Sequence, residues 1–339
     1  MPELKINLKV TNRCMGRCPG CDARISWYRA KPKEFEGSSD LDLDLAKRII
    51  SEASESGFKK IVLSGGEPTS YPYLLDIVRF AKAHNFIVKL NTNGWSLPNL
   101  IDDLHHAGLD SIALSLYSLD RSTYFLLRGH YGMFARALKA VDSLSVHRKI
   151  YPDTFSAILQ TIITKVNFRD LPRLLKLAIE NKFSAFATSY LEDAYRHPEI
   201  QMSTQDIHAF HEDVIPELLS IMDSYPLTPS ARQRNMKTLQ SYFSPEINTI
   251  KNWAQGIYRP LGQSDCGQPG NFLLMYPGGA AAPCYGFEYT HVKDLMDTTL
   301  DKAIGDVING GKFRAFTKTS FDFCHYCPIG FHLWLDLSQ

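Results

Sequence analysis

The sequence predicts an α/β fold: a partial (β/α)6 barrel of the TIM-like kind, followed by a helical segment and a small α+β domain. Strand-like and helix-like stretches alternate six times over residues 4–190, and this alternation favours a parallel sheet with right-handed crossovers. The alternation stops after Asp193, and the patterns that follow are mostly helical. From Gln263 onward, glycine, proline and cysteine separate short strand-like runs. We therefore expect three units, 1–193, 194–262 and 263–339.

Each expected element of the first unit has its own local signal. The strands are short apolar or alternating runs, at 4–10, 59–66, 86–94, 109–117, 154–164 and 182–192. The helices repeat apolar residues at helical spacing, at 41–56, 73–85, 98–107, 133–144 and 171–181. The first helix has Asp40 or Asp42 as its N-cap and Gly57 as its stop signal. An open doubly wound sheet is the other arrangement that this pattern allows.

Residues suited to chemistry follow the expected strands. In chain order they are the cysteine-rich stretch 14–21, "GGEP", "NTNG", "SLYS", "TKVN" and "YLED". The turns at the other strand ends, such as "ESGFKK" and "HNF", look like plain connections. The carboxyl ends of parallel strands share one edge, where barrels and open sheets both place their chemistry. We therefore expect a single functional edge.

The composition narrows the class of protein. The chain has 339 residues, 44% hydrophobic and 22% charged, with a formal net charge of +1. Nucleic-acid and membrane-surface binders need clustered positive charge, so we expect neither partner. The charged start "MPELKINLKV" is no signal peptide, and no run reaches the length of a membrane span. We expect a cytoplasmic protein, whose cysteines stay reduced and serve as metal ligands or catalysts.

The seven cysteines fall into a group of three and a group of four at opposite ends of the chain. The first group, Cys14, Cys18 and Cys21, has C-x3-C-x2-C spacing in "CMGRCPGC". One interpretation is a zinc site that recruits a distant fourth ligand, for which His84, His105 and His106 are candidates. The other is an iron–sulfur cluster that keeps one iron open for an exogenous ligand.

At this point the chain resembles a known family, the radical S-adenosylmethionine (SAM) enzymes. The resemblance rests on "CMGRCPGC", "GGEP", "TNG", Ser115, "SLYSLDRSTYFLLRGHYGMFARALKAV" and "TKVN", in that order and each at an expected strand end or in the helix after it. It implies that Cys14, Cys18 and Cys21 hold a [4Fe-4S] cluster whose open iron binds the amino and carboxylate groups of SAM. Electron transfer into the sulfonium would then release a 5′-deoxyadenosyl radical that abstracts hydrogen from a substrate.

The resemblance also assigns cofactor contacts. The expected SAM-binding residues are Gly65, Gly66, Glu67, Pro68, Asn91, Asn93, Ser115, Arg128 and Ile163. Glu67 would accept from the ammonium group, the two glycines would let the backbone approach SAM closely, and Arg128, or else Arg136, would meet the carboxylate. The family often has a bulky residue just before the third cysteine, where this chain has Gly20. Trp27, Tyr28 or Ile163 is expected to contact the adenine in its place.

The second group consists of Cys266, Cys284, Cys324 and Cys327, the last two in "FCHYC". Four cysteines can hold zinc, as in a zinc ribbon. The tail is also similar to the SPASM or shorter twitch domain of radical SAM enzymes, with a hairpin around "YPGG" and a helix in "TLDKAIGDVING". That resemblance implies a second [4Fe-4S] cluster, fully ligated, whose role is to accept or pass an electron.

Two clusters would use all seven cysteines, so none remains to quench a substrate radical with hydrogen. We therefore expect oxidation of a small polar metabolite of the sugar, aminocyclitol or nucleoside type, similar to that of twitch-bearing dehydrogenases. The alternatives are redox-neutral decarboxylation or dehydration, modification of a ribosomal peptide, and a zinc scaffold without enzymatic activity. Because the first cysteine motif begins at Cys14, we expect no leader-recognition domain before it, which lowers the expectation of a peptide substrate.

Oxidation of an alcohol needs a base for the hydroxyl proton. The candidates are Glu192, Asp193 and Tyr117, with Tyr190 and Arg196 as further possibilities at the same strand ends. A flavodoxin- or ferredoxin-type protein is the expected electron donor.

Overall fold

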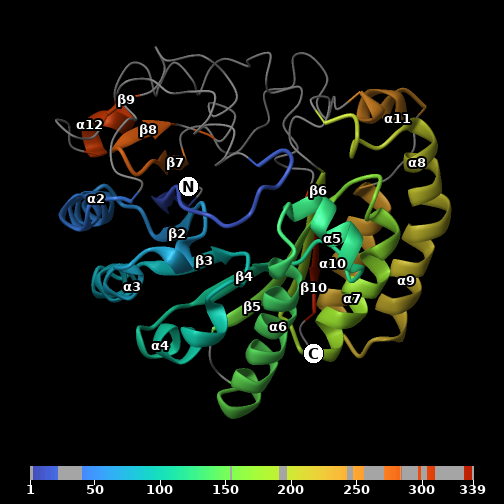
Figure 1. Ribbon diagram of the computed structural model, residues 1–339, viewed down its shortest axis with the longest axis horizontal. Helices are drawn as coiled ribbons and strands as arrows, with labels where there is room; N and C mark the ends of the chain where they lie inside the picture. Colours follow the sequence, from blue (N-terminus) through green and yellow to red (C-terminus); the bar gives the residue numbers. More distant parts are fainter. Residues whose placement is uncertain are drawn as a thin grey trace.

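The strands of this protein join in a single sheet. The computed structural model describes residues 3–21, 40–152, 155–190, 197–242, 247–255, 271–282, 284, 297–298, 304–309 and 332–337. In these ranges the sheet has ten strands in the order β10-β6-β5-β4-β3-β2-β1-β7-β8-β9 (Figure 1). The six strands from β1 to β6 are parallel and consecutive, which confirms the repeated β/α pattern.

The strands and helices of the barrel lie close to the ranges that the sequence predicts. The strands are β1 (Lys5–Thr11), β2 (Lys60–Gly65), β3 (Ile87–Thr92), β4 (Ser111–Ser115), β5 (Ser156–Ile163) and β6 (Ala185–Tyr190). The helices between them are α2 (Leu43–Glu55), α3 (Leu74–Ala83), α4 (Ile101–His106), α5 (Arg121–Arg128), α6 (Gly132–Ile150) and α7 (Leu171–Glu180). Short 3-10 turns η2 (Pro68–Ser70), η3 (Leu97–Asn99) and η4 (Phe168–Asp170) precede α3, α4 and α7.

Two helices differ from the sequence prediction. The connection between β4 and β5 contains α5 as a separate helix, because Asp120 caps it by accepting from the Thr123 N–H and Gly129 ends it in a left-handed conformation. α6 begins close to its predicted start but continues to Ile150, six residues past the predicted end at Leu144.

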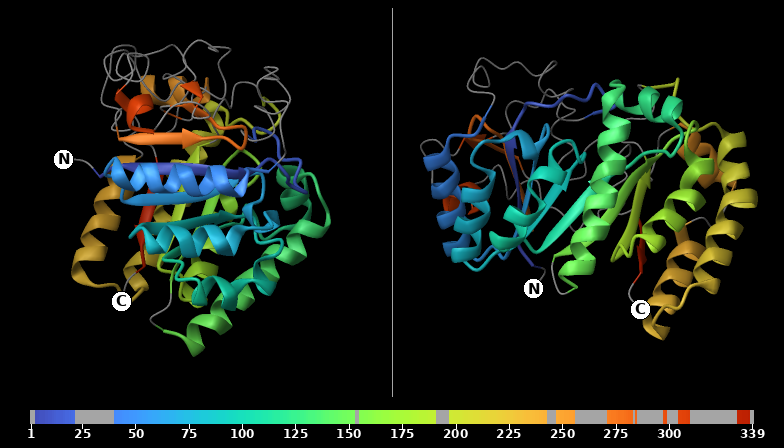
Figure 2. Two further views of the ribbon diagram at one scale, coloured as in Figure 1. Left: turned by 90° about the vertical axis from the view of Figure 1, so that its left-hand side faces the viewer. Right: turned by 60° about the horizontal axis from the view of Figure 1, so that its bottom comes forward.

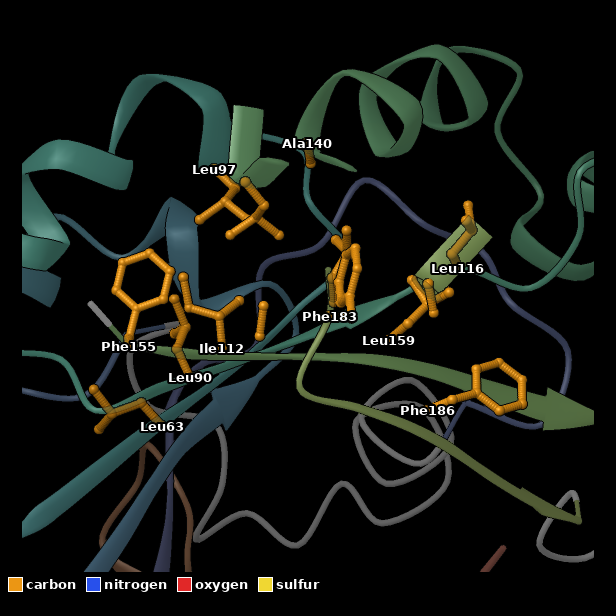
Figure 3. Packing of buried hydrophobic residues seen from close by; sticks show 14 of the residues in the cluster. Leu63, Leu90, Leu97, Ile112, Leu116, Ala140, Phe155, Leu159, Phe183 and Phe186 are labelled. Carbon is orange, nitrogen blue, oxygen red and sulfur yellow. The ribbon is translucent and has the colours of Figure 1, made fainter. Parts of the chain in front are cut away.

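Side-chain alternation along the strands separates two faces of the sheet. Ile6, Leu8 and Val10 of β1 are fully buried in the main core beneath the helices. The same core holds Leu63, Leu90, Ile112 and Leu159 from the next strands (Figure 3). The helices from α2 to α7 cover this face (Figure 2). The intervening residues of each strand therefore point to the opposite, concave face.

The segment after the barrel is helical, as predicted. It contains α8 (Thr204–Ala209), the π-helical turn η6 (Phe210–Val214), α9 (Ile215–Ser224), α10 (Pro229–Tyr242) and α11 (Ile247–Ala254). Helix α9 packs on α7, and α10 packs on β10 (His332–Asp336). The Asn235 side chain fixes the second contact, since its amide donates to the Asp336 carbonyl at 2.7 Å and its oxygen accepts from the Asp336 N–H at 2.9 Å.

The strands of the C-terminal region extend both sides of the barrel sheet. β7 (Phe272–Met275) pairs parallel with β1, and β8 (Ala280–Ala282) and β9 (Asp297–Thr298) follow antiparallel. Strands β7 and β8 form the hairpin predicted around "YPGG". Helix α12 (Ile304–Asn309) lies within the helix predicted in "TLDKAIGDVING". β10 was not predicted, and it pairs antiparallel with β6. The described part of the chain has no helix long and apolar enough to cross a membrane.

Candidate functional site

The first three cysteines occupy the loop that leaves β1 at its carboxyl end. Cys14 is exposed, whereas Cys18 and Cys21 are half-buried. Gly16 lies between the first two, and a Cβ on it would be 3.4 Å from the Cys18 sulfur and 3.5 Å from the Cys14 sulfur. The two sulfurs therefore border one small gap, which any side chain at residue 16 would enter.

Hydrogen-bond donors point at these sulfurs. The Gly16 N–H and the Asn93 amide donate to Cys14 Sγ at 3.3 and 3.6 Å, and Arg128 Nη1 donates to Cys18 Sγ at 3.6 Å. Such donors stabilise thiolate ligands and tune cluster potentials. Although the Cys14 residue as a whole is exposed, the packing around its sulfur desolvates it and raises the pKa of the thiol to about 11, and the Gly16 N–H opposes that shift. Metal ligation at Cys14 must therefore displace a proton.

"GGEP" is attached to the cysteine loop by its backbone. The Gly66 N–H donates to the Thr11 carbonyl at 2.6 Å, and the Glu67 N–H donates to the Arg13 carbonyl at 2.7 Å. Gly65 has φ +136°, and a Cβ there would lie 2.2 Å from the Thr11 oxygen. A Cβ on Gly66 would lie 2.3 Å from the Arg13 oxygen. Contact with the chain's own backbone is thus enough to require both glycines, in addition to the close approach of SAM that the resemblance implies.

The Glu67 carboxylate joins the second and third strand ends. Its Oε1 accepts from the Thr69 N–H at 3.0 Å and from the hydroxyls of Thr69 and Thr92 at 2.6 Å each. Its Oε2 accepts from the Asn93 N–H at 2.7 Å. The side chain is 1% exposed, so these four donors fill most of its accepting capacity. Glu67 therefore positions Asn93, which in turn contacts Cys14.

Arg128 is buried against the fourth strand end and the cysteine loop. Its Nη2 donates to the Ser115 carbonyl at 2.9 Å, and its guanidinium stacks on the Tyr117 ring at 3.6 Å. The Arg128 carbonyl accepts from the Arg17 N–H at 2.8 Å, so the end of α5 is also fixed to the loop. Burial alone would lower the pKa of Arg128, but Tyr117, Tyr124 and Cys18 outweigh it and raise that pKa. The guanidinium is charged at any physiological pH.

Tyr117, one of the expected catalytic bases, has a phenol that is hard to deprotonate. Desolvation raises the pKa of its phenol, and the neighbouring Arg128 charge only partly offsets this rise. The phenol is therefore protonated at neutral pH. The contact that Tyr117 makes with Arg128 is that of a stacking platform.

The buried polar atoms that lack a hydrogen-bond partner among the described residues include two that face the cofactor side of this edge. They are Nε of Arg128 and Oδ1 of Asn91, which lies on the concave face of β3. Buried polar atoms are nearly always paired in native proteins, so each of these suits a bound polar ligand. Three cysteines on one loop, two of them with donors to their sulfurs, together with a buried cation and an unpaired amide oxygen fit a [4Fe-4S] cluster with SAM beside it.

Three further residues were expected to contact SAM, and the structure places each of them. Pro68 is buried as the first residue of η2. Ile163 is 2% exposed and belongs to the helix-side core, while alternation along β5 turns Ile162 to the concave side. An adenine contact by Ile163 remains a prediction, one that this alternation does not favour. Arg136 lies with its guanidinium 5.3 Å from the Trp95 ring.

Hydrogen bonds that no motif predicted hold the cysteine loop and the loop after β5. Arg13 binds Asp40 through two bonds, of 2.9 and 2.7 Å, and donates to the Ser70 carbonyl at 2.8 Å. Asn167 of "TKVN" is 1% exposed and donates to the Tyr117 and Ile162 carbonyls at 2.7 Å each. No local pattern signals the bonds from Arg13 to Asp40 and Ser70 or from Asn167 to Tyr117, because these partners are tens of residues apart in sequence.

The histidines considered for a zinc site are far from the cysteines. His84 follows α3 before β3 begins, and His105 and His106 end α4 before β4 begins. In a parallel sheet these positions lie at the edge opposite to the cysteine loop. His84 Nδ1 contacts the Phe80 carbonyl at 2.9 Å, and His105 contacts His147. In the described ranges no three His, Cys, Asp or Glu side chains converge on a single ion.

Several predicted residues fall outside the described ranges. They are Glu192, Asp193, Arg196, Trp27, Tyr28, Cys266, Cys324 and Cys327. Cys284 is described and buried, two residues past β8. Tyr190 is buried at the end of β6.

Solved structures share the whole fold. SuiB of Streptococcus suis, solved with S-adenosylmethionine, superposes with a TM-score of 0.65 over 96% of this chain and 69% of its own, at 16% identity. The enzyme anSMEcpe, with bound AdoMet and a peptide, gives a TM-score of 0.61 over 99% of this chain and 88% of its own, also at 16% identity.

Curated relatives match the barrel. The probable GTP 3′,8-cyclase of Pyrococcus abyssi is 27% identical over 172 residues, 51% of this chain and 53% of that protein. The PqqA peptide cyclase of Ruegeria pomeroyi is 32% identical over 174 residues, 51% of this chain and 43% of that protein. The matches thus span about half the length of these relatives. Residues 8–182, more than half of the chain, match the family described as the Radical SAM superfamily, and the chain belongs to that superfamily.

Proposed function

We propose that this enzyme abstracts a hydrogen atom from a small polar metabolite of the sugar, aminocyclitol or nucleoside type, and that an auxiliary cluster accepts the second electron. The bound cluster and SAM supply one-electron cleavage of SAM and the hydrogen abstraction that follows. The observation that carries the substrate class is the lining of the concave face. There Asn7, Ser64, Asn91, Ser115 and Gln160 alternate with the apolar residues beneath the helices.

These concave-face residues suit a hydroxylated substrate. Ser64, Asn91, Ser115 and Gln160 are half-buried, and the buried Oδ1 atom of Asn91 has no hydrogen-bond partner among the described residues. Short amide and hydroxyl side chains both donate and accept hydrogen bonds, which matches the hydroxyl groups of a sugar or cyclitol.

The site geometry supports the proposed cofactor contacts. Cys14, Cys18 and Cys21 would hold the first cluster, and Arg128 would present its guanidinium to the SAM carboxylate. Ser115 acts through its carbonyl, which orients Arg128. Glu67 and the two glycines hold the loops that surround the cofactor.

The auxiliary site is proposed for Cys266, Cys284, Cys324 and Cys327. Because β8 is antiparallel to β7, and β7 is parallel to β1, the chain at Cys284 runs toward the edge where β1 begins. The first cysteine group lies at the other end of β1. Six residue steps from Lys5 to Thr11 span about 20 Å, so a substrate on the concave face would lie between the two sites.

The alternatives differ in their products. A redox-neutral decarboxylase or dehydratase needs no electron acceptor. A peptide modifier would resemble SuiB and anSMEcpe, which have been solved with peptides. The likeness to those two proteins is one of fold, and the curated relatives include both a nucleotide cyclase and a peptide cyclase.

The test measures how product formation is coupled to SAM cleavage. Anaerobically reconstituted enzyme is incubated with deuterated metabolites of the three proposed types, with SAM and with reduced flavodoxin or ferredoxin. We expect deuterium in 5′-deoxyadenosine and one oxidised product per SAM cleaved. Cys324→Ala should lower the yield of oxidised product per SAM cleaved. An undiminished yield would exclude the electron-acceptor role, and transfer of deuterium only from a peptide would exclude the metabolite class.

A further inference from the structure

Three lysines line the barrel strands on the concave side. Lys5 and Lys9 lie on β1, between residues that are buried under the helices, and Lys89 lies between the buried Val88 and Leu90 of β3. Alternation therefore directs all three away from the helices. An interior lined with ammonium groups is unusual, because lysine is rarely buried without a compensating charge.

The lysines of β1 are placed against aromatic rings. Lys9 is 5% exposed, and its ammonium lies 5.2 Å from the Tyr276 ring centre. The Lys5 ammonium lies 5.6 Å from the ring centre of Phe272, its register partner on β7. Ring faces stabilise a cation without cancelling its charge.

Lys89 differs from the lysines of β1, because no described residue places a ring face or a negative charge against its ammonium. It is half-buried, and it has no hydrogen bond or ion pair within the described ranges. Burial lowers the pKa of Lys89, and the nearby positive charge of Lys5 lowers it further. No described carboxylate counters these two effects. Glu67, the buried carboxylate at the top of the barrel, already accepts four hydrogen bonds.

The position of Lys89 separates it from both cysteine groups. It is the register partner of Val62 on β2 and of Ser111 on β4. On β3 it precedes Asn91 by two residues, so it lies farther from the carboxyl ends of the strands. The cysteine loop begins beyond the top of β1, and Cys284 follows β8, four strands away in the sheet order. The charge of Lys89 therefore faces the space in which the substrate is proposed to bind.

We infer that the concave face binds an anionic group of the substrate, a carboxylate or a phosphate, through the ammonium of Lys89 with Lys5 and Lys9 nearby. This inference rests on the proposed function for the location of the substrate. The recognised group is a small oxyanion, because the lysine ammonium has a compact charge and three hydrogen-bond donors. These features suit a carboxylate as well as a phosphate. The polar neighbours Asn7, Ser64 and Ser111 would hydrogen-bond the remainder of the substrate.

The test uses two simple anions and requires no turnover. Reconstituted holoenzyme is titrated calorimetrically with inorganic phosphate and, separately, with succinate, each against chloride at equal ionic strength. We compare the wild type with Lys89→Met, Lys89→Gln and Lys89→Arg. The matched control is Lys139→Met, on the exposed surface of α6.

We expect at least one anion to bind the wild type and Lys139→Met equally, and to bind Lys89→Met and Lys89→Gln about tenfold more weakly. Lys89→Arg should recover part of the affinity. Selective phosphate binding identifies a phosphorylated substrate, and selective succinate binding identifies a carboxylate. The inference is overturned if neither anion binds better than chloride, or if both bind the Lys89 variants as tightly as the wild type. Failure of wild-type enzyme to cleave SAM would instead contradict the proposed function.

Discussion

At the residue scale, Glu67 shows how a motif residue can serve the cofactor indirectly. The resemblance assigned it to the SAM ammonium, yet its carboxylate accepts four hydrogen bonds from Thr69, Thr92 and Asn93. Those bonds align the second and third strand ends before any ligand arrives. The geometry thus adds a positioning role that the motif alone does not reveal.

Glu67→Gln tests that role. Whichever way the amide is turned, its NH2 faces a backbone N–H, either of Thr69 or of Asn93. An unsatisfied buried donor costs about 1–3 kcal/mol, so we expect the free energy of unfolding of the apoprotein in urea to fall by that amount. Glu55→Gln, at the exposed end of α2, is the control and should change nothing measurable. Equal stability of the two variants would show that the Glu67 network is not structural.

Gly66→Ala tests the backbone contact between "GGEP" and the cysteine loop. The new Cβ would meet the Arg13 oxygen at 2.3 Å, so the loop must shift. We expect a loss of about 1–3 kcal/mol or more in stability, and poor iron uptake on reconstitution. In Gly57→Ala the nearest side-chain atom lies 4.0 Å away, and only the positive φ of +87° is strained. The free energy of unfolding of that control should fall by about 1–2 kcal/mol, and its iron uptake should stay normal. Normal iron uptake by Gly66→Ala would contradict the account.

Sequence reasoning located the residues of the site well but not their partners. Cys14, Asn93 and Arg128 were expected at one edge and do meet there, because strand ends are read from periodicity. The bonds from Arg13 to Asp40 and from Asn167 to the Tyr117 carbonyl were not foreseen. They depend on how loops from different strands pack, and no local pattern encodes that.

At the element scale, the barrel was predictable because each strand and helix has a clear hydrophobic period. β10 was missed, since a five-residue run near the chain end carries no sign of its distant partner. It pairs with β6 in the antiparallel direction, and its Leu333 and Leu335 are fully buried in the main core. The C-terminal region therefore covers the β6 edge of the barrel sheet.

Leu335→Ala tests whether β10 contributes to the hydrophobic core. Removing a fully buried leucine side chain costs about 2–5 kcal/mol, so urea unfolding should shift accordingly. Ile87→Ala provides the matched control, because Ile87 is also an aliphatic strand residue but is 46% exposed. Its loss should stay below about 1 kcal/mol. If Leu335→Ala cost no more than the control, β10 would not be part of the core.

At the scale of the whole molecule, the strand directions place the first cysteine group and Cys284 toward opposite ends of β1. The first follows β1 at its carboxyl end, and Cys284 follows a strand that runs back toward the other edge. Cysteine spacing predicts two metal sites, and the strand directions add where the first cysteine group and Cys284 lie relative to β1. The substrate itself is not encoded in any motif, because it is read by side chains from many strands.

The measurement that tests the central claim most directly is 5′-deoxyadenosine formation, with the iron content determined on the same samples. Wild-type protein reconstituted without oxygen should bind about eight irons per chain and should release 5′-deoxyadenosine from SAM when reduced. Cys14→Ala should retain about four irons, in the auxiliary cluster, and release none. Zinc in place of iron in the wild type, or 5′-deoxyadenosine release by Cys14→Ala at the wild-type rate, would contradict the account.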